Sequence, residues 1–240
     1  MDRKIYHCYI RQSNNLTICY CINRLKMKIF LPLILSLVFP WSAFSKEINQ
    51  TSPYKMRMSL FASLNHHRDV VMLGDSITAR AEWSELLPDV SVANRGIGGD
   101  EIQYMALRLG SVLSVSPKVV FIMGGVNDFG HRRKSNDVFN DYKKIINYLS
   151  SRNIKVKVQS TLYISRENRL DNNTEIHKLN VSLKSYCEES AECSFINLNE
   201  HMSLNGEIRP QYTGDGIHLT GDGYQKWASI IYPIAKQYNK

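Results

Sequence analysis

The sequence predicts an α/β protein, a three-layer α/β/α sandwich around a central, mostly parallel sheet of five strands. Two observations support this fold class. From residue 69 onward, short runs of apolar and β-branched residues alternate with stretches of helical periodicity. Three of these runs also lead directly into glycine-bearing segments that carry polar residues. Strands separated by helices form right-handed crossovers, which make the strands parallel and cover both faces of the sheet with helices.

Five strands and five helices are expected, each from its own pattern. The strands are the apolar runs at 69–73, 90–93, 118–123, 154–159 and 194–198. The helices are expected at 78–87, 101–112, 136–152, 173–189 and 221–238. The first and third strands (DVVML and KVVFIM) are almost entirely apolar, which is typical of strands covered on both faces. In 136–152 the apolar residues recur at the spacing of a helix with one buried face.

Composition and charge place the chain among globular proteins with one core. Hydrophobic residues make up 43% and charged residues 22% of the 240 residues, and no repeat or low-complexity tract interrupts them. The net charge of +8 is concentrated at the N-terminus, because residues 1–45 hold six basic residues and one acidic residue. The remaining 24 basic and 21 acidic residues give the body a charge of only +3. Nucleic acid is therefore not expected as a partner.

The segment 27–45 has the pattern of a secretory signal peptide. Lys26 and Lys28 precede an apolar run over 29–41, and small residues follow at Ala43 and Ser45. The run is too short to predict a stable membrane span, and the pattern indicates a secreted or periplasmic protein. A short N-terminal anchor or a buried helix is the alternative.

The signal-peptide pattern also divides the rest of the chain. A signal sequence normally begins at its own methionine, so residues 1–26 are interpreted as a mis-assigned extension ahead of a true start at Met27. Residues 46–68 form an N-terminal segment, and residues 69–240 form the functional domain.

Five cysteines divide along the same boundary. Cys8, Cys19 and Cys21 lie in the extension and lack the second ligand pair that a zinc site needs, so no metal site is predicted. Cys187 and Cys193 are six positions apart, and in an exported protein they can close a small loop as a disulfide. Two unpaired thiols are the alternative.

Three residues have the chemistry of a nucleophilic triad. Ser76 directly follows a buried strand, at the start of a helix. Asp215 and His218 are separated by two residues before the last helix, so one turn can present both toward a common point. A serine nucleophile needs an imidazole to accept its proton, and the imidazole needs a carboxylate to fix its tautomer. The alternatives are a helix N-cap for Ser76 and an Asx-turn with an incidental histidine for the other two.

Two further strand ends supply candidate donors for a developing oxyanion. Gly99 lies in a glycine loop, and Asn127 follows the third strand. A loop N–H and a side-chain amide both suit this role, although both residues are also typical of turns. Asp75, Asp100 and Asp128 flank these positions and are interpreted as residues that brace the loops.

Four segments in this order resemble the blocks of the SGNH hydrolases, also called GDSL esterases. They are VVMLGDSIT (70–78), NRGIGGD (94–100), GGVND (124–128) and DGIHL (215–219). The resemblance implies a flavodoxin-like sandwich and ester hydrolysis through an acyl-serine intermediate, with no metal or organic cofactor. It assigns Ser76 as nucleophile, His218 as base and Asp215 as the acid that orients it. It also assigns the oxyanion hole to the N–H groups of Ser76 and Gly99 and the amide of Asn127.

The expected substrate is a small-molecule or glycan ester with a short acyl group. Acetyl is favoured because the loops are brief. The segments are also similar to those of the platelet-activating-factor-acetylhydrolase-like and carbohydrate-acetylesterase branches, which favours acetyl as well. A lysophospholipase or thioesterase acting on longer acyl chains is the alternative within the enzymes. A non-catalytic glycan-binding module of the same fold is the alternative outside them. The sequence does not predict an oligomeric state.

Overall fold

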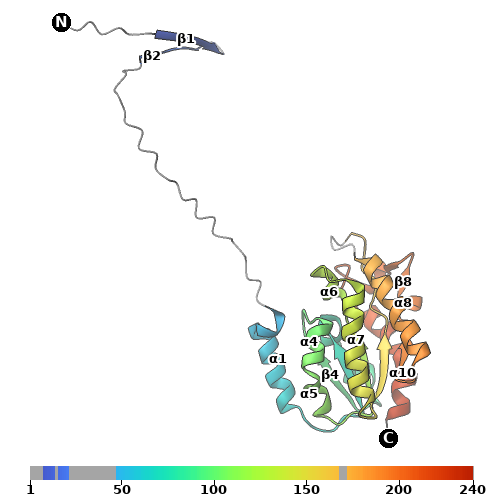
Figure 1. Ribbon diagram of the computed structural model, residues 1–240. Coiled ribbons are helices and arrows are strands. Elements are labelled where there is room, and N and C mark those ends of the chain that lie inside the picture. The colour runs from blue at the N-terminus through green and yellow to red at the C-terminus, as the bar shows by residue number, and fades with distance from the viewer. Residues whose placement is uncertain (1–7, 14–15, 22–46, 168–171, 240) are drawn as a thin grey trace, which may run out of the picture. The chain divides into compact units, whose positions relative to one another are not determined.

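The computed structural model describes residues 8–13, 16–21, 47–167 and 172–239 (Figure 1). The chain divides into two compact units, Met1–Phe44 and Ser45–Lys240. In the first unit, β1 (Cys8–Ser13) pairs antiparallel with β2 (Leu16–Cys21), a hairpin that the sequence patterns did not predict. The predicted signal peptide at 27–45 lies outside the described residues. Within the described part of the chain, no helix is long and apolar enough to span a membrane.

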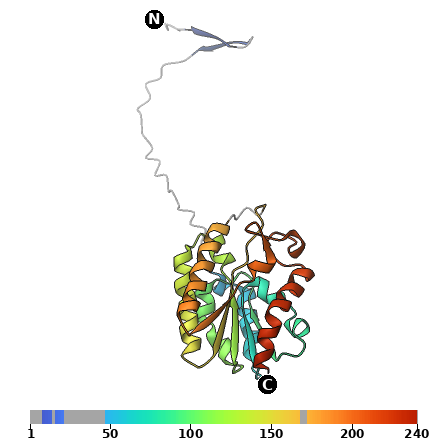
Figure 2. The ribbon, with the colours of Figure 1, turned by 90° about the vertical axis from the view of Figure 1, so that its right-hand side faces the viewer.

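The second unit is built on the predicted five-stranded parallel sheet (Figure 2). The strand order is β4-β3-β5-β6-β7, and every pair is parallel. The bounds are β3 Val70–Gly74, β4 Val92–Gly96, β5 Val119–Met123, β6 Lys155–Gln159 and β7 Cys193–Ile196. All residues of β3 and β5 are buried, as their unbroken apolar sequence requires. The predicted fold class is therefore confirmed.

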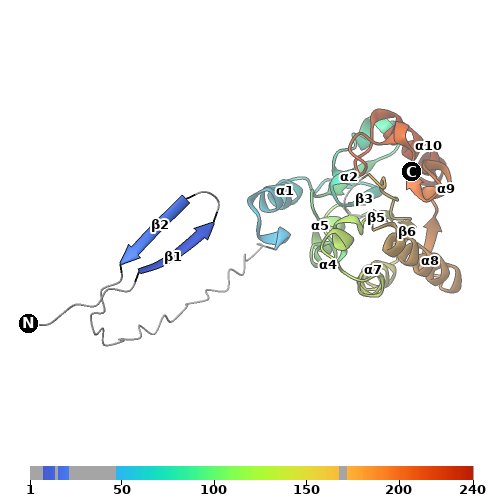
Figure 3. The ribbon, with the colours of Figure 1, turned by 90° about the horizontal axis from the view of Figure 1, so that it is seen from above.

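Helices cover both faces of the sheet (Figure 3). One layer holds α4 (Ile102–Leu107), α5 (Leu109–Leu113), α7 (Ser135–Ser150) and α8 (Asn173–Glu189). The other holds α2 (Ser76–Ala79), α3 (Trp83–Leu86) and α10 (Gly221–Ala235). In this second layer the buried rings of Trp83 and Trp227 meet edge to face at 4.8 Å and join α3 to α10.

Several short elements complete the fold. They are the helices α6 (Val126–Gly130) and α9 (Asn199–Met202), the hairpin of β8 (Ser203–Leu204) and β9 (Glu207–Ile208), and three 3₁₀ turns at Ile48–Gln50, Pro210–Tyr212 and Lys236–Tyr238.

Two predicted helices are each broken in two. The expected helix at 78–87 is interrupted between α2 and α3, where the Asn94 amide donates to the carbonyls of Thr78, Ala79 and Ala81 at 3.1–3.2 Å. These carbonyls are therefore satisfied from β4 and not by a continuing helix. The expected helix at 101–112 breaks at Arg108, whose backbone lies outside the helical region at φ −112° and ψ 20°. Hydrophobic periodicity does not register such breaks, because the apolar face continues across them.

Residues 46–68, for which no structure was predicted, contain α1 (Ser52–Ser63). The Thr51 side chain caps this helix by accepting from the Tyr54 N–H at 3.4 Å. Only Tyr54 and Phe61 are buried along its length, and they form a small separate cluster with Ile97. Two apolar contacts seven residues apart are too few for a clear periodic signal.

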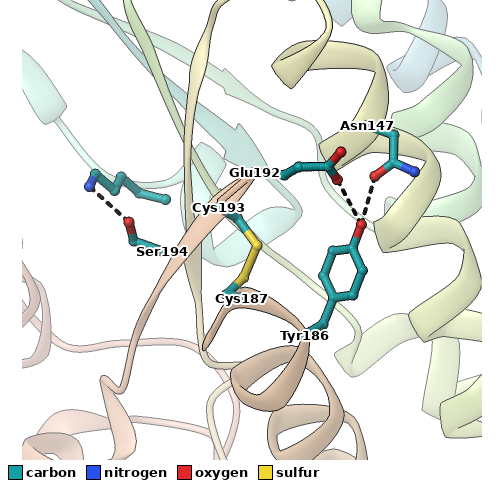
Figure 4. The surroundings of a disulfide bond; sticks show 7 residues. Asn147, Tyr186, Cys187, Glu192, Cys193 and Ser194 are labelled. Carbon is teal, nitrogen blue, oxygen red and sulfur yellow. Dashed lines mark hydrogen bonds between the residues drawn. A yellow bond between two sulfur atoms is a disulfide. The ribbon is translucent and has the colours of Figure 1, made fainter. Parts of the chain in front are cut away.

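Cys187 and Cys193 form a disulfide that ties the last turn of α8 to the first residue of β7 (Figure 4). The neighbouring Tyr186 hydroxyl lies 2.8 Å from the Glu192 carboxylate and 2.8 Å from the Asn147 side chain. These contacts join α8, the turn before β7 and α7. The disulfide therefore closes a short loop that side chains also hold.

Replacing both Cys187 and Cys193 by Ser should lower the free energy of unfolding by about 2 kcal/mol, since a short closed loop removes only modest entropy from the unfolded chain. Urea denaturation of the oxidised protein and the double variant measures the difference. Reduced wild-type protein is the matched control and should behave like the variant. Equal stability of oxidised and reduced wild type would contradict the prediction.

Candidate active site

The candidate residues meet at the carboxyl ends of three neighbouring strands. Ser76 follows β3, Gly99 follows β4 and Asn127 follows β5. β3 lies between β4 and β5, and the chain changes direction across the sheet at this point. Open parallel sheets place ligands at such a switch point, beyond the carboxyl ends of the strands. The sheet topology thus brings together residues that are up to 51 positions apart in this part of the sequence.

Ser76 is the first residue of α2 and is half-buried. It is not the N-cap, because the Asp75 carboxylate accepts the Ile77 N–H at 2.9 Å and fills that role. The Ser76 hydroxyl instead lies 3.0 Å from Nε2 of His218. This contact joins residues 142 positions apart, at the first and last segments of the site.

Asp215 binds both the ring and the backbone of the turn that carries His218. Its Oδ2 lies 2.6 Å from Nδ1 of His218, and its Oδ1 accepts the N–H groups of Ile217 and His218 at 2.9 and 2.7 Å. The Asx-turn and the imidazole contact therefore coexist in one carboxylate. Partial burial alone would raise the pKa of Asp215, but these hydrogen bonds outweigh it and lower the pKa to about 2.

The hydrogen bond between Asp215 and His218 determines the tautomer of the imidazole ring. With Nδ1–H donating to the carboxylate, Nε2 is left as an acceptor that faces the Ser76 hydroxyl. Asp215 remains ionised at neutral pH because its pKa is so low. The three side chains thus form a continuous hydrogen-bonded chain from hydroxyl to carboxylate.

Three groups near Ser76 have an N–H hydrogen without an acceptor among the described residues. In the described part of the chain, the backbone N–H groups of Ser76 and Gly99 make no hydrogen bond. The Asn127 amide donates to the Asp100 carbonyl at 2.9 Å, which uses one of its two hydrogens. Gly99 has a φ of +76°, and a Cβ there would lie 3.0 Å from Cδ1 of Ile48, so the position favours glycine.

Asp75, Asp100 and Asp128 are almost fully buried behind this site. Asp100 pairs with Arg108 at 2.7 Å, and Asp128 accepts the Ile102 N–H at 3.2 Å and pairs with Arg133. Burial raises the pKa of Asp75 and Asp128 to about 7 and that of Asp100 to about 6, and the two arginines oppose this only in part.

Arg108 was not singled out by the sequence patterns, although it connects two of the loops. Besides its ion pair with Asp100, it donates to the Gly74 carbonyl at 3.1 Å. It therefore ties the end of β3, just before Ser76, to the loop of Gly99. One signal was available in the sequence: a charged residue occupies the apolar face that Ile102, Met105 and Leu109 define in the expected helix.

A groove of about 940 Å³ with a mixed polar and apolar lining opens beside Asp215. The β8–β9 hairpin and the turn before His218 form most of it. Its lining includes Ser165, Glu207 and Thr213 together with the apolar Leu204 and Ile208. Among the described residues, no group of three or more His, Cys, Asp or Glu side chains is arranged to hold a metal ion.

Residues 72–226, more than half of the chain, match the sequence model of the GDSL-like Lipase/Acylhydrolase family. The chain belongs to this family. The match with the family model spans every candidate residue described above. The resemblance of the four sequence segments to GDSL esterases is confirmed.

Two similar proteins agree with this assignment, and a third is named for a different reaction. The alpha2 subunit of platelet-activating factor acetylhydrolase IB from Homo sapiens is 25% identical over 177 residues, which cover 70% of this chain and 76% of that protein. A GDSL-like lipase from Bacteroides thetaiotaomicron has a solved structure with a TM-score of 0.66 and 26% identity, over 77% of this chain and 97% of that one. An N-acylneuraminate cytidylyltransferase of Streptococcus agalactiae is 25% identical over 156 residues, 65% of this chain. The chain spans only 36% of the length of that cytidylyltransferase.

The buried Asp75 should make the protein less stable as pH rises from about 4 to about 7. Its pKa of about 7 means that the folded state keeps a proton that the unfolded chain, with an ordinary carboxyl pKa of 3.8, has released. Asp75→Asn cannot ionise and still offers an acceptor to the Ile77 N–H, so it should reduce this loss of stability. Urea denaturation at several pH values in this range measures the effect.

The exposed Asp137 provides the matched control, since Asp137→Asn removes one carboxylate from the surface. This variant should keep the pH dependence of the wild type. An Asp75→Asn variant whose stability changes with pH as steeply as the wild type would exclude Asp75 as a source of the effect.

Proposed function

We propose that this acylhydrolase removes a short acyl group, acetyl above all, from a carbohydrate or another small ester through an acyl-serine intermediate. The observation that carries the proposal is the hydrogen-bonded chain in which Ser76 Oγ lies 3.0 Å from His218 Nε2 and His218 Nδ1 lies 2.6 Å from Asp215. In this proposal Ser76 is the nucleophile, His218 the general base and Asp215 the carboxylate that orients the ring.

Acylation begins when the substrate carbonyl lies beside Ser76. His218 Nε2 takes the hydroxyl proton while Oγ bonds to the carbonyl carbon, and the carbonyl oxygen becomes an oxyanion. The imidazolium that forms is stabilised by Asp215, which stays ionised because of its low pKa. The free N–H groups of Ser76 and Gly99 and the second amide hydrogen of Asn127 bind the oxyanion.

In the two later steps, His218 first gives up the proton taken from Ser76 and then takes a new one from water. The tetrahedral intermediate collapses when His218 Nε2–H protonates the leaving alcohol, which leaves the acyl group on Ser76. Water then enters, gives a proton to Nε2 and attacks the acyl carbon. Release of the carboxylic acid returns the proton to Ser76 Oγ.

The short acyl group and the carbohydrate are supported by the relatives and by the groove. The human relative is a subunit of an acetylhydrolase. The groove beside Asp215 offers hydroxyl and carboxylate side chains, including Ser165, Thr213 and Glu207, which suit a leaving group rich in hydroxyls.

A secreted or periplasmic location is part of the same proposal. The Cys187–Cys193 disulfide supports it, since such bonds persist mainly in oxidising compartments. The pattern at 27–45 supports it independently.

Hydrolysis of p-nitrophenyl esters by the purified full chain tests the reaction and the acyl length together. Ser76→Ala should lose at least about 1,000-fold in kcat, because the nucleophile is removed while the fold is kept. Ser114→Ala, which removes an exposed hydroxyl, is the matched control and should retain full activity. Activity that survives Ser76→Ala would exclude Ser76 as nucleophile.

The acyl series from acetyl to decanoyl then decides between substrate classes. A maximum of kcat/KM at acetyl supports the proposed short-chain esterase. A maximum at eight carbons or more would replace it by a lysophospholipase or thioesterase.

Replacing Asn127 by Ala should lower kcat by about 100-fold or more with little change in KM, since the amide acts on the oxyanion of the transition state. Steady-state kinetics on p-nitrophenyl acetate measure both constants, and circular dichroism checks the fold. The isosteric Asn127→Asp variant cannot donate from that position and should be equally slow. A normal kcat in both variants would remove Asn127 from the oxyanion hole.

A further inference from the structure

A second pocket, of about 210 Å³, lies between the C-terminal part of α1 and the edge strand β4. None of its lining residues belongs to the chain of Ser76, His218 and Asp215 or to the groove beside it. Its polar lining is dominated by cationic side chains, namely Arg57, Arg68 and Arg95, with His66 beside them.

Arg95 is buried, with 2% of its surface exposed, yet it has no charged partner among the described residues. Its guanidinium donates to three backbone carbonyls, those of Ser111 at 2.8 Å, Asn94 at 3.2 Å and Leu64 at 2.6 Å. Three of the five N–H donors of an arginine are thereby used. Burial lowers the pKa of Arg95 to about 10, and repulsion from Arg108, Arg57 and Arg68 adds to the effect.

The other two arginines also bind only neutral groups. Arg57 donates to the Gly96 carbonyl at 3.3 Å, and Arg68 donates to the His67 carbonyl at 2.8 Å. In the part of the chain that the structure describes, no carboxylate lies within ion-pair distance of either residue. The Phe61 ring lies 5.1 Å from the guanidinium of Arg57 and 4.8 Å from that of Arg95, and it offsets part of the repulsion.

This arrangement differs from the other enclosed arginines of the protein. Arg108 pairs with Asp100, and Arg133 pairs with both Asp128 and Asp141. Buried charges are normally paired in this way, because an unpaired charge in a medium of low dielectric constant is costly. Three arginines gather around a cavity and, among the described residues, none of them forms an ion pair, although Glu82 acts on Arg57 from a longer distance. The arrangement therefore leaves room for an external anion.

We propose that the pocket between α1 and β4 binds a tetrahedral oxyanion, a phosphate or sulfate group, through Arg57, Arg68 and Arg95. Among the described residues, two N–H donors of Arg95 have no acceptor, and the same holds for most N–H donors of Arg57 and Arg68. These donors outnumber those that the two oxygens of a carboxylate can engage. Guanidinium groups match the oxygens of such anions in pairs and bind them by charge-assisted hydrogen bonds.

The anion can be a free ion or a group esterified to a larger molecule. Inorganic phosphate, inorganic sulfate and glucose 6-phosphate are therefore the three probes for the test. Tighter binding of glucose 6-phosphate identifies an esterified group, and tighter binding of an inorganic ion identifies the free ion. Both results support the oxyanion site.

Isothermal titration calorimetry on the full chain, at constant ionic strength in chloride buffer, measures the binding. One equivalent of at least one probe should bind saturably below about 10 mM. Arg68→Gln should weaken this binding about tenfold, because the variant loses one or two charge-assisted hydrogen bonds to the anion. Arg68 is exposed, so the variant should fold, which circular dichroism checks.

The matched control is Arg152→Gln, which removes the same charge from an exposed position at the end of α7. It should bind the probes as the wild type does. Absence of saturable binding by all three probes would overturn the proposal. Equal weakening in Arg68→Gln and Arg152→Gln would also overturn it, since only the overall charge would then matter.

Discussion

The candidate site depends on one buried charge, the guanidinium of Arg108. It holds the end of β3 through the Gly74 carbonyl and the loop after β4 through Asp100. The Asp100 carbonyl in turn accepts the amide of Asn127, which follows β5. A buried ion pair tolerates little displacement, because separating its charges leaves each of them unsolvated. Three separate strand ends are therefore connected through this one ion pair and the Asp100 carbonyl.

The sheet and the meeting of the candidate residues could be predicted from the sequence because both follow from local patterns and topology. β3 and β5 are unbroken apolar runs, and Ser76 and Asn127 come two and four residues after their ends. Parallel strands bring their carboxyl ends to one edge whatever the sequence between them. The contact between Ser76 and His218 could not be predicted from topology alone, because it depends on how the turn before α10 packs over the sheet. The order of the four family-like segments predicted this contact instead.

The features that could not be predicted depend on contacts between distant residues. The break between α2 and α3 follows from the Asn94 side chain of β4, and α1 is held by two apolar residues over its whole length. The pocket of Arg57, Arg68 and Arg95 combines residues from a helix, a loop and a strand, none of which stands out in a chain with 30 basic residues. Patterns within one segment carry no information about such assemblies.

The position of Ile48 has a consequence if the proposed signal peptide is removed. Its side chain fills the space that a Cβ at Gly99 would enter, so a residue ahead of α1 packs beside a proposed oxyanion donor. Cleavage after Ser45, where the signal pattern ends, would leave Ile48 two residues from the new amino terminus. One short segment would then carry the cleavage site and also contribute to the shape of the Gly99 loop. Trimming by a few further residues would uncover the loop without touching the sheet.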